Sequence, residues 1–249
     1  MKIAISQPTY LPWIGYFDLI DQVDLFVLLD NVQLEKRSWQ QRNRIKTRNG
    51  LQWLTIPVAS RGKRDQRIVD VEVSESDFWR DHLRTIELNY HHAPFFKTYF
   101  DSLSECVERE AAFGNLSRLT VGLIEWVKDA LGIKRRLIRA SNLSADGKRT
   151  ELLANICVGL GANEYLSPLG SAEYLLSDLP LMTAKGIGVA FHHYEHPVYR
   201  QLYSPFQPYA CALDLLFNEG GQALDIIRSG RRTSYTPEEA ALVYVAVAS

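Results

Sequence analysis

A stiff, polar segment at residues 7–17 offers side chains that suit a phosphate or sugar ligand. It follows a short apolar run and leads into residues with helical spacing, which is where a parallel α/β sheet presents ligands to a helix N-terminus. Gln7, Tyr10 and Tyr16 supply the hydrogen-bonding groups. The segment equally fits a rigid turn whose aromatic residues, such as Trp13, belong to the core, and the sequence leaves both interpretations open.

A second group of candidate binding residues begins at Asp30, where the next apolar run ends. Gln33 follows it, and residues 37–44 place several arginines beside a tryptophan. Because arginine binds phosphate through paired hydrogen bonds, this cluster, with Asn43 and Arg44 at its end, is the best candidate for a phosphate site. A solvated basic loop and a platform for single-stranded nucleic acid are the alternatives.

The histidines form two groups, at residues 91–92 and 192–196. Neighbouring strand residues face opposite ways, so His192 and His193 cannot share a metal ion without a bend, and no cysteine or HExxH partner supports zinc. We therefore expect no metal. His196 follows the last predicted strand and precedes a proline, a position that suits a general base in a cleft, although a packed histidine fits the pattern too.

The chain lacks the common catalytic signatures. It has no GxGxxG after the first strand, no GxxxxGK[ST], no GxSxG and no kinase motif, so dehydrogenase, P-loop and serine hydrolase chemistry has no support. Asp214 and Asn218 share one helix face before a glycine, which suits either local packing or substrate binding. The sequence does not indicate which cofactor, if any, the protein uses.

The secondary-structure elements that position these residues indicate an α/β fold. Apolar runs at 3–5 and 25–29 flank helical spacing at 13–20, which predicts a βαβ unit whose continuously apolar strands are covered on both faces. The Asn49-Gly50 pair predicts a β-hairpin beside the cleft. We expect a Rossmann-like, mostly parallel sheet flanked by helices, with this inserted hairpin and a helical layer.

Further elements follow by the same spacing rules. Helices are predicted at 75–89, 94–112, 115–131, 150–160, 171–176, 212–229 and from 237 onward, and strands at 137–138, 164–166 and 187–191. No linker divides the chain, so we expect a single domain over 1–249, with a helical insertion at about 75–131 and a C-terminal helical extension from about 212.

Composition narrows the class of protein. The 249 residues are 46% hydrophobic and 23% charged, which is typical of a globular protein. The net charge of −1 provides no overall positive electrostatic field that would attract nucleic acid. No apolar run approaches a membrane span, so we expect no membrane insertion and a cytoplasmic location. The 3 cysteines are distant in sequence and read as buried thiols; a Cys–His catalytic pair is the alternative.

Six separated motifs, taken together, resemble the WbqC-like protein family. They are QPTYLPWIGYF at 7–17, LLDNVQ at 28–33, RNRIKT at 42–47, YLSPLGSAEYL at 165–175, HPVYRQ at 196–201 and LDLLFNEGG at 213–221. Ser167-Pro168 and Ala210-Cys211-Ala212 depart from a Ser-Gly pair and from a serine that are common in the family. The resemblance implies these site residues: Gln7, Tyr10, Trp13, Asp30, Gln33, Asn43, Arg44, His196, Tyr199, Gln201, Asp214 and Asn218.

The resemblance also implies a role in O-antigen or other surface-polysaccharide synthesis, through attachment of a glycyl or other acyl group to an amino sugar. The leading hypothesis is thus an amide-forming acyl or aminoacyl transferase whose partners are a nucleotide-linked amino sugar and an activated acyl donor. His196 and Asp30 are the catalytic candidates: His196 deprotonates the amine, while Asp30 orients the sugar with Gln33. Arg44 and Asn43 hold phosphate.

Two alternatives come from other functional classes. One is a non-catalytic scaffold that binds a nucleotide sugar. The other is a nucleotidyltransferase or ligase using ATP, because the opening βαβ unit also looks like that of HxGH-type enzymes, although Trp13-Ile-Gly-Tyr16 replaces their histidines. A homo-oligomer is compatible with either.

Overall fold

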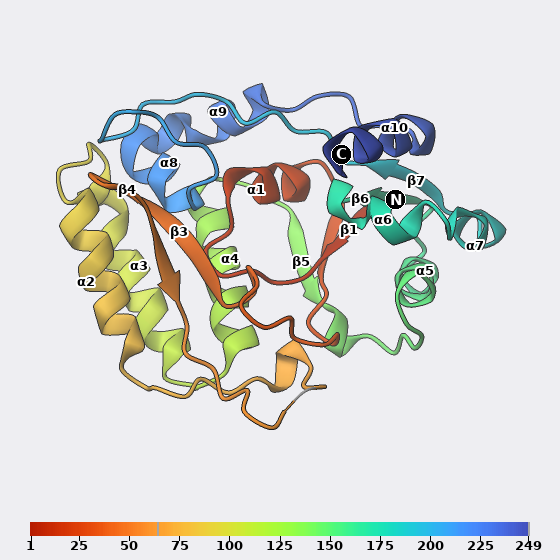
Figure 1. Ribbon diagram of the computed structural model, residues 1–249, viewed down its shortest axis with the longest axis horizontal. Coiled ribbons are helices and arrows are strands. Elements are labelled where there is room, and N and C mark those ends of the chain that lie inside the picture. The colour runs from red at the N-terminus through yellow and green to blue at the C-terminus, as the bar shows by residue number, and fades with distance from the viewer. Residues whose placement is uncertain (64, 249) are drawn as a thin grey trace.

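The computed structural model describes residues 1–63 and 65–248, built around a five-stranded parallel sheet (Figure 1). The strand order is β5-β2-β1-β6-β7. This confirms the predicted class, a parallel sheet flanked by helices with a separate hairpin. The strands are β1 (Lys2–Ser6), β2 (Leu25–Leu28), β5 (Arg136–Arg139), β6 (Glu164–Ser167) and β7 (Gly188–Phe191).

The apolar runs of the central strands are continuous because both faces of the sheet are covered. In β1, Ala4 packs into one hydrophobic cluster, while Ile3 and Ile5 pack into the other. Strand β2 repeats the alternation and is buried throughout. Since successive side chains of a strand point to opposite faces, the two clusters are the cores on the two sides of one sheet.

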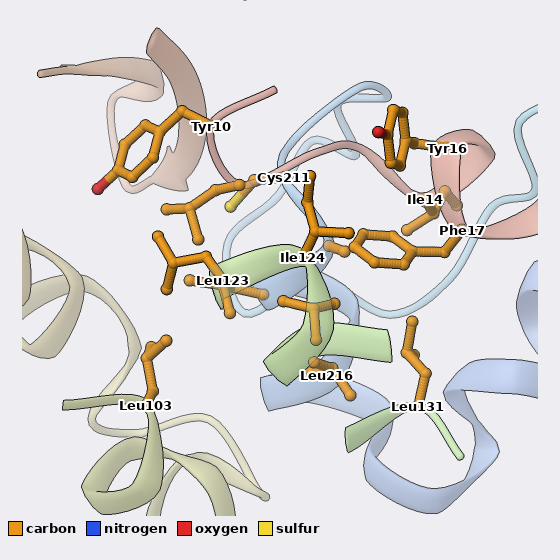
Figure 2. Packing of buried hydrophobic residues seen from close by; sticks show 14 of the residues in the cluster. Tyr10, Ile14, Tyr16, Phe17, Leu103, Leu123, Ile124, Leu131, Cys211 and Leu216 are labelled. Carbon is orange, nitrogen blue, oxygen red and sulfur yellow. The ribbon is translucent and has the colours of Figure 1, made fainter. Parts of the chain in front are cut away.

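Helices far apart in sequence cover the first face of the sheet, and Figure 2 shows the packing of this cluster. Asn115, the first residue of the helix predicted at 115–131, caps α4 by accepting a hydrogen bond from the backbone nitrogen of Arg118. Pro94, the first residue of the helix predicted at 94–112, lies instead in the turn before α3. The helices here are α1 (Ile14–Asp21), α2 (Phe78–Tyr90), α3 (Phe96–Ala111), α4 (Leu116–Ala130), α8 (Ala212–Glu219) and α9 (Ala223–Ser229).

The single helix expected over 212–229 is divided into α8 and α9. Gly220 ends α8 with a φ of +54°, a backbone conformation that glycine adopts at little cost. A 3₁₀ turn at Gly220–Gln222 then leads into α9. A Cβ on Gly220 would also collide with the ring of Phe95, so packing too requires a glycine here.

The opposite face is covered by α5 (Thr150–Gly159), α6 (Ala172–Leu175), α7 (Leu179–Ala184) and α10 (Pro237–Ala248). Helix α7, with a proline in its first turn, was not expected from the sequence. Helix α10 contacts β7 and α6. The single-domain organisation stays a prediction.

The hairpin of β3 (Arg42–Thr47) and β4 (Gly50–Thr55) stands apart from the main sheet. Its strands pair antiparallel from Arg42 opposite Thr55 to Thr47 opposite Gly50. Gly50 has a φ of +108°, which explains the Asn-Gly sequence at the turn. Among the helices that the structure describes, none is long and apolar enough to cross a membrane.

Candidate functional site

The main candidate site is a cavity of about 480 Å³ at the carboxyl edge of the parallel sheet. Ser6 at the end of β1, Pro168 just after β6 and His192 just after β7 all line it. From β1 the strand order runs to β2 and β5 on one side and to β6 and β7 on the other. This reversal point is where open α/β sheets bind ligands.

Arg44 brings a positive charge to this cavity from the hairpin. Its guanidinium carbon lies 5.4 Å from the ring centroids of both Trp39 and Trp53. Its Nε atom is buried without a hydrogen-bond partner among the described residues. The Arg44 guanidinium forms no ion pair with another described residue, so its charge suits an anionic ligand in the cavity that it lines.

Asn43 lines the same cavity, but its amide is engaged with the backbone. Its Nδ2 donates to the carbonyl oxygen of Leu11 at 2.8 Å, and its Oδ1 accepts from the backbone nitrogen of Arg44 at 2.8 Å. Asn43 therefore ties the hairpin to the loop after β1 and positions Arg44.

His192 is the cavity residue best suited to take up a proton. Its Nε2 donates to Oδ2 of Asp18 at 2.8 Å, and the Asp18 side chain is fully buried in α1. Arg231 donates to the other Asp18 oxygen at 2.9 Å, so this group is a carboxylate, which only accepts hydrogen bonds. Nε2 thus carries the proton, and Nδ1, which has no partner among the described residues, keeps its lone pair for a ligand.

A second carboxylate reinforces this arrangement. Burial opposes ionisation of Asp21, but hydrogen bonds from Arg228 and Arg231 outweigh it and lower the Asp21 pKa. Arg231 bridges Asp21 and Asp18, with 2.6 Å between its Nη2 atom and Oδ2 of Asp21. The network therefore clamps the end of α1 and holds Asp18 rigidly behind His192.

One feature of the sequence indicates that Asp18 has a buried partner such as His192. Asp18 lies within the otherwise apolar segment Ile14-Gly-Tyr-Phe-Asp-Leu-Ile20, and a charge buried there requires a partner. The sequence pattern by itself suggests His192 only as a metal ligand. Among the described residues, no group of three or more His, Cys, Asp or Glu side chains is placed to hold a metal ion.

His196, the base proposed from the sequence, lies behind the cavity wall. Its ring stacks on Trp13 with centroids 6.1 Å apart and packs against Tyr209, and both of these neighbours line the cavity. Its Nδ1 is 2.9 Å from the carbonyl oxygen of Pro197, and its Nε2 is buried without a partner among the described residues. Burial lowers the pKa of His196, so the ring is neutral and supports Trp13.

Asp30 and Gln33 lie outside this cavity. Asp30 is fully buried and accepts hydrogen bonds from Ser117 and from the backbone and side chain of Ser141. It also lies 3.3 Å from Nε of Arg139, so it joins the ends of β2 and β5 to α4. Gln33 borders a different hollow. Their roles toward a sugar stay predictions.

Four other sequence candidates meet in a buried network around Asp214. Its carboxylate accepts from Tyr90 at 3.0 Å, from Tyr199 at 2.8 Å and from Gln201 at 2.9 Å, and Asn218 donates to its backbone oxygen. Burial raises the pKa of Asp214. None of these residues lines the cavity, so the network joins α8, α2 and the 199–207 loop.

Of the remaining site candidates, one lines the cavity and another lies in the hydrophobic core. Trp13 lines the cavity, whereas Tyr10 is buried and its hydroxyl pairs with His82 at 2.8 Å. The cysteines are buried as expected, and burial raises the pKa of Cys157 and Cys211 to about 12. Thiols in this state are poor nucleophiles.

Comparison with known proteins agrees with the motifs seen in the sequence. The model of the WbqC-like protein family matches residues 7–226. This chain belongs to the WbqC-like protein family. The match includes β1's exit loop, the hairpin, Asp18 and His192, but ends just before Arg228 and Arg231.

A relative of this WbqC-like protein is the uncharacterized protein Rv1507c of Mycobacterium tuberculosis (strain ATCC 25618 / H37Rv). The two are 40% identical over 233 residues, which cover 93% of this chain and 99% of the relative. No solved structure matches the chain.

Proposed function

We propose that this WbqC-like protein is an amide-forming acyl or aminoacyl transferase that acts on a nucleotide-activated amino sugar. The observation that carries the proposal is that Arg44, an unsatisfied cation, and His192, an oriented base, line one cavity. Arg44 is suited to bind the phosphate of an activated sugar, and His192 is suited to take a proton from its amine. The place of the product in a surface polysaccharide rests on the family resemblance.

Amide formation requires the amine to lose a proton, because an ammonium ion has no lone pair with which to attack. In the proposed step, Nδ1 of His192 takes a proton from the amine as its nitrogen bonds to the acyl carbon. The bond between that carbon and the leaving group of the donor then breaks. The imidazolium returns the proton to the leaving group, and Asp18 stabilises the intervening charge.

His192 replaces His196 as the base in this proposal. The hydrogen bond to Asp18 fixes one tautomer of His192, whereas Nε2 of His196 is enclosed among aromatic rings. The cavity walls contributed by Trp13, Tyr16 and Tyr209 supply aromatic surface against which a sugar ring can pack.

The test is to incubate the purified protein with a panel of nucleoside-diphosphate amino sugars and activated acyl donors. Mass spectrometry should detect a product that has gained the acyl group and lost its free amine. His192→Ala should abolish this product, whereas His193→Ala, the adjacent control, should retain it. His196→Ala should reduce turnover less than His192→Ala, through altered packing of Trp13.

Two outcomes would contradict the proposal. Full turnover in His192→Ala would remove the proposed base. Tight binding of a nucleotide sugar without any amide product across the panel would instead favour the scaffold hypothesis.

A further inference from the structure

A second hollow, of about 380 Å³, borders the main cavity. Ser6, Thr9, Trp39 and Pro168 line both of them. The second hollow extends toward the opposite face of the sheet, where residues at and near α5 and α6 border it. Together the two form a cleft that straddles the reversal point between β1 and β6.

The two halves of the cleft differ in charge. The main cavity has Arg44, whereas the described residues that line the second hollow include no lysine, arginine or histidine. Glu35 is the charged residue among them, and most of the others that can form hydrogen bonds are amides and hydroxyls. A ligand that spans the cleft would therefore place its anionic part at Arg44 and an uncharged, polar part in the hollow.

Hydrogen bonds fix the orientation of one amide in this hollow. The backbone nitrogen of Glu35 donates to Oε1 of Gln40 at 2.9 Å, so Gln40 must present its Nε2 in the other direction. That Nε2 donates to Oε1 of Gln7 at 2.5 Å. The Nε2 of Gln7 is left without a partner among the described residues, in a side chain that lines the hollow. Gln7 is thus a positioned donor.

We propose that this hollow binds the nucleoside of the activated substrate, with Nε2 of Gln7 donating to an acceptor on the base. This proposal rests on the proposed function, which places the diphosphate at Arg44 and the amino sugar beside His192. A nucleoside is the uncharged remainder of such a substrate. Its base can stack on Trp39 or Tyr174, and its ribose hydroxyls can donate to the Glu35 carboxylate.

Calorimetric titration of the whole protein tests this assignment with two kinds of probe. Nucleoside 5′-monophosphates of all four bases are compared with ribose 5-phosphate, which has the phosphate but no base. We expect at least one monophosphate to bind tenfold or more tightly than ribose 5-phosphate. Gln7→Leu should remove that advantage and leave the Kd of ribose 5-phosphate within about twofold.

Two further variants separate recognition from folding. In Gln40→Glu, the new carboxylate can accept from Gln7, so the Gln7 amide reverses and turns its oxygen toward the hollow. The base-dependent advantage should fall at least fivefold, again without a change in ribose 5-phosphate binding. Gln222→Leu, an exposed glutamine that lines neither half of the cleft, should bind both probes as the unmodified protein does.

The possible results distinguish this inference from the proposed reaction. Equal binding of all monophosphates and ribose 5-phosphate, or an unchanged advantage in Gln7→Leu, would overturn the nucleoside assignment even if amide transfer is observed. A Gln7-dependent advantage would support it even if no amide product forms.

Discussion

Nε2 of His192 lies 2.8 Å from Oδ2 of Asp18, a contact that links the end of β7 to the middle of α1. The two strands that lead to these residues, β1 and β7, are separated in the sheet by β6. The hydrogen bond therefore fixes the orientation of the His192 imidazole, which lines the ligand cavity. Because Asp18 is also held by Arg231, rotation of Asp18 would break an ion pair, and rotation of His192 would break its hydrogen bond to Asp18.

Asp18→Asn tests whether this orientation matters for the proposed chemistry. The asparagine amide cannot stabilise an imidazolium as a carboxylate does and no longer fixes which nitrogen carries the proton. We expect kcat of the transfer to fall on the order of a hundredfold or more, with a smaller change in KM for the nucleotide sugar. Steady-state kinetics over a range of pH values would measure this.

Asp129→Asn is the matched control, because the Asp129 side chain is exposed and pairs only with Lys128 among the ion pairs of the described residues. It should keep the kcat and the pH profile of the unmodified protein. If Asp18→Asn also keeps both, His192 is not the base.

Arg44→Ala should weaken binding of the phosphate-bearing substrate by roughly tenfold or more, since a hydrogen bond to a charged group contributes about 1.5–3 kcal/mol. Arg44→Lys should rescue little, because lysine lacks the second, parallel donor. Arg42→Ala is the control: its guanidinium lies over Trp53 at 4.3 Å, but Arg42 does not line the cavity. Equal Kd values for the Arg42 and Arg44 variants would argue against a phosphate site here.

Gly15→Ala should distort the cavity wall. A Cβ at this position would overlap the indole of Trp13, so the ring must move. We expect a loss of about 1–3 kcal/mol in the free energy of unfolding, and weaker binding of any ligand that contacts Trp13. Thermal and urea denaturation would measure the first effect.

Gly159→Ala provides the contrast, because an added Cβ at this α5 residue meets open space. It should leave stability unchanged or raise it by about 0.4–1 kcal/mol. Similar losses in both variants would show that the Gly15 effect does not come from Trp13.

The local pattern of the sequence predicted the elements well because each element follows from nearby residues. The buried run of β2, the Asn49-Gly50 turn and the Asn115 cap all depend on side chains within a few positions of one another. The sequence places a glycine after Asn218 yet also predicts one helix over 212–229, because a glycine can either end a helix or lie within it; in the structure Gly220 ends α8.

The role of His196 as the base stays a prediction from the sequence, and the geometry leads us to propose His192 instead. His192 and Asp18 are 174 positions apart, and only the sheet topology brings them together. Likewise, the sequence does not show whether the carboxylates of Asp30 and Asp214 bind a ligand or other groups of the protein. Their partners, Ser141 and Tyr199 among them, show that both are used inside the protein.

His82 makes the stability of the fold depend on pH. Burial lowers its pKa from 6.5 to about 4, and its Nδ1 is paired with the hydroxyl of Tyr10 at 2.8 Å. Between these two values the unfolded chain binds a proton that the folded chain does not. The free energy of unfolding should therefore fall as the pH is lowered from about 6.5 to about 4, by about 2–3 kcal/mol in total.

Urea denaturation at pH 7 and pH 4.5 would measure this loss. In His82→Phe it should shrink by most of that amount, because the variant has no group at this position to protonate, even though removing the partner of Tyr10 lowers stability at both pH values. His91→Gln, a change at an exposed histidine, should keep the full loss. An identical pH dependence in His82→Phe and the unmodified protein would mean that His82 is not the buried neutral imidazole that its contacts with Tyr10 and Phe78 indicate.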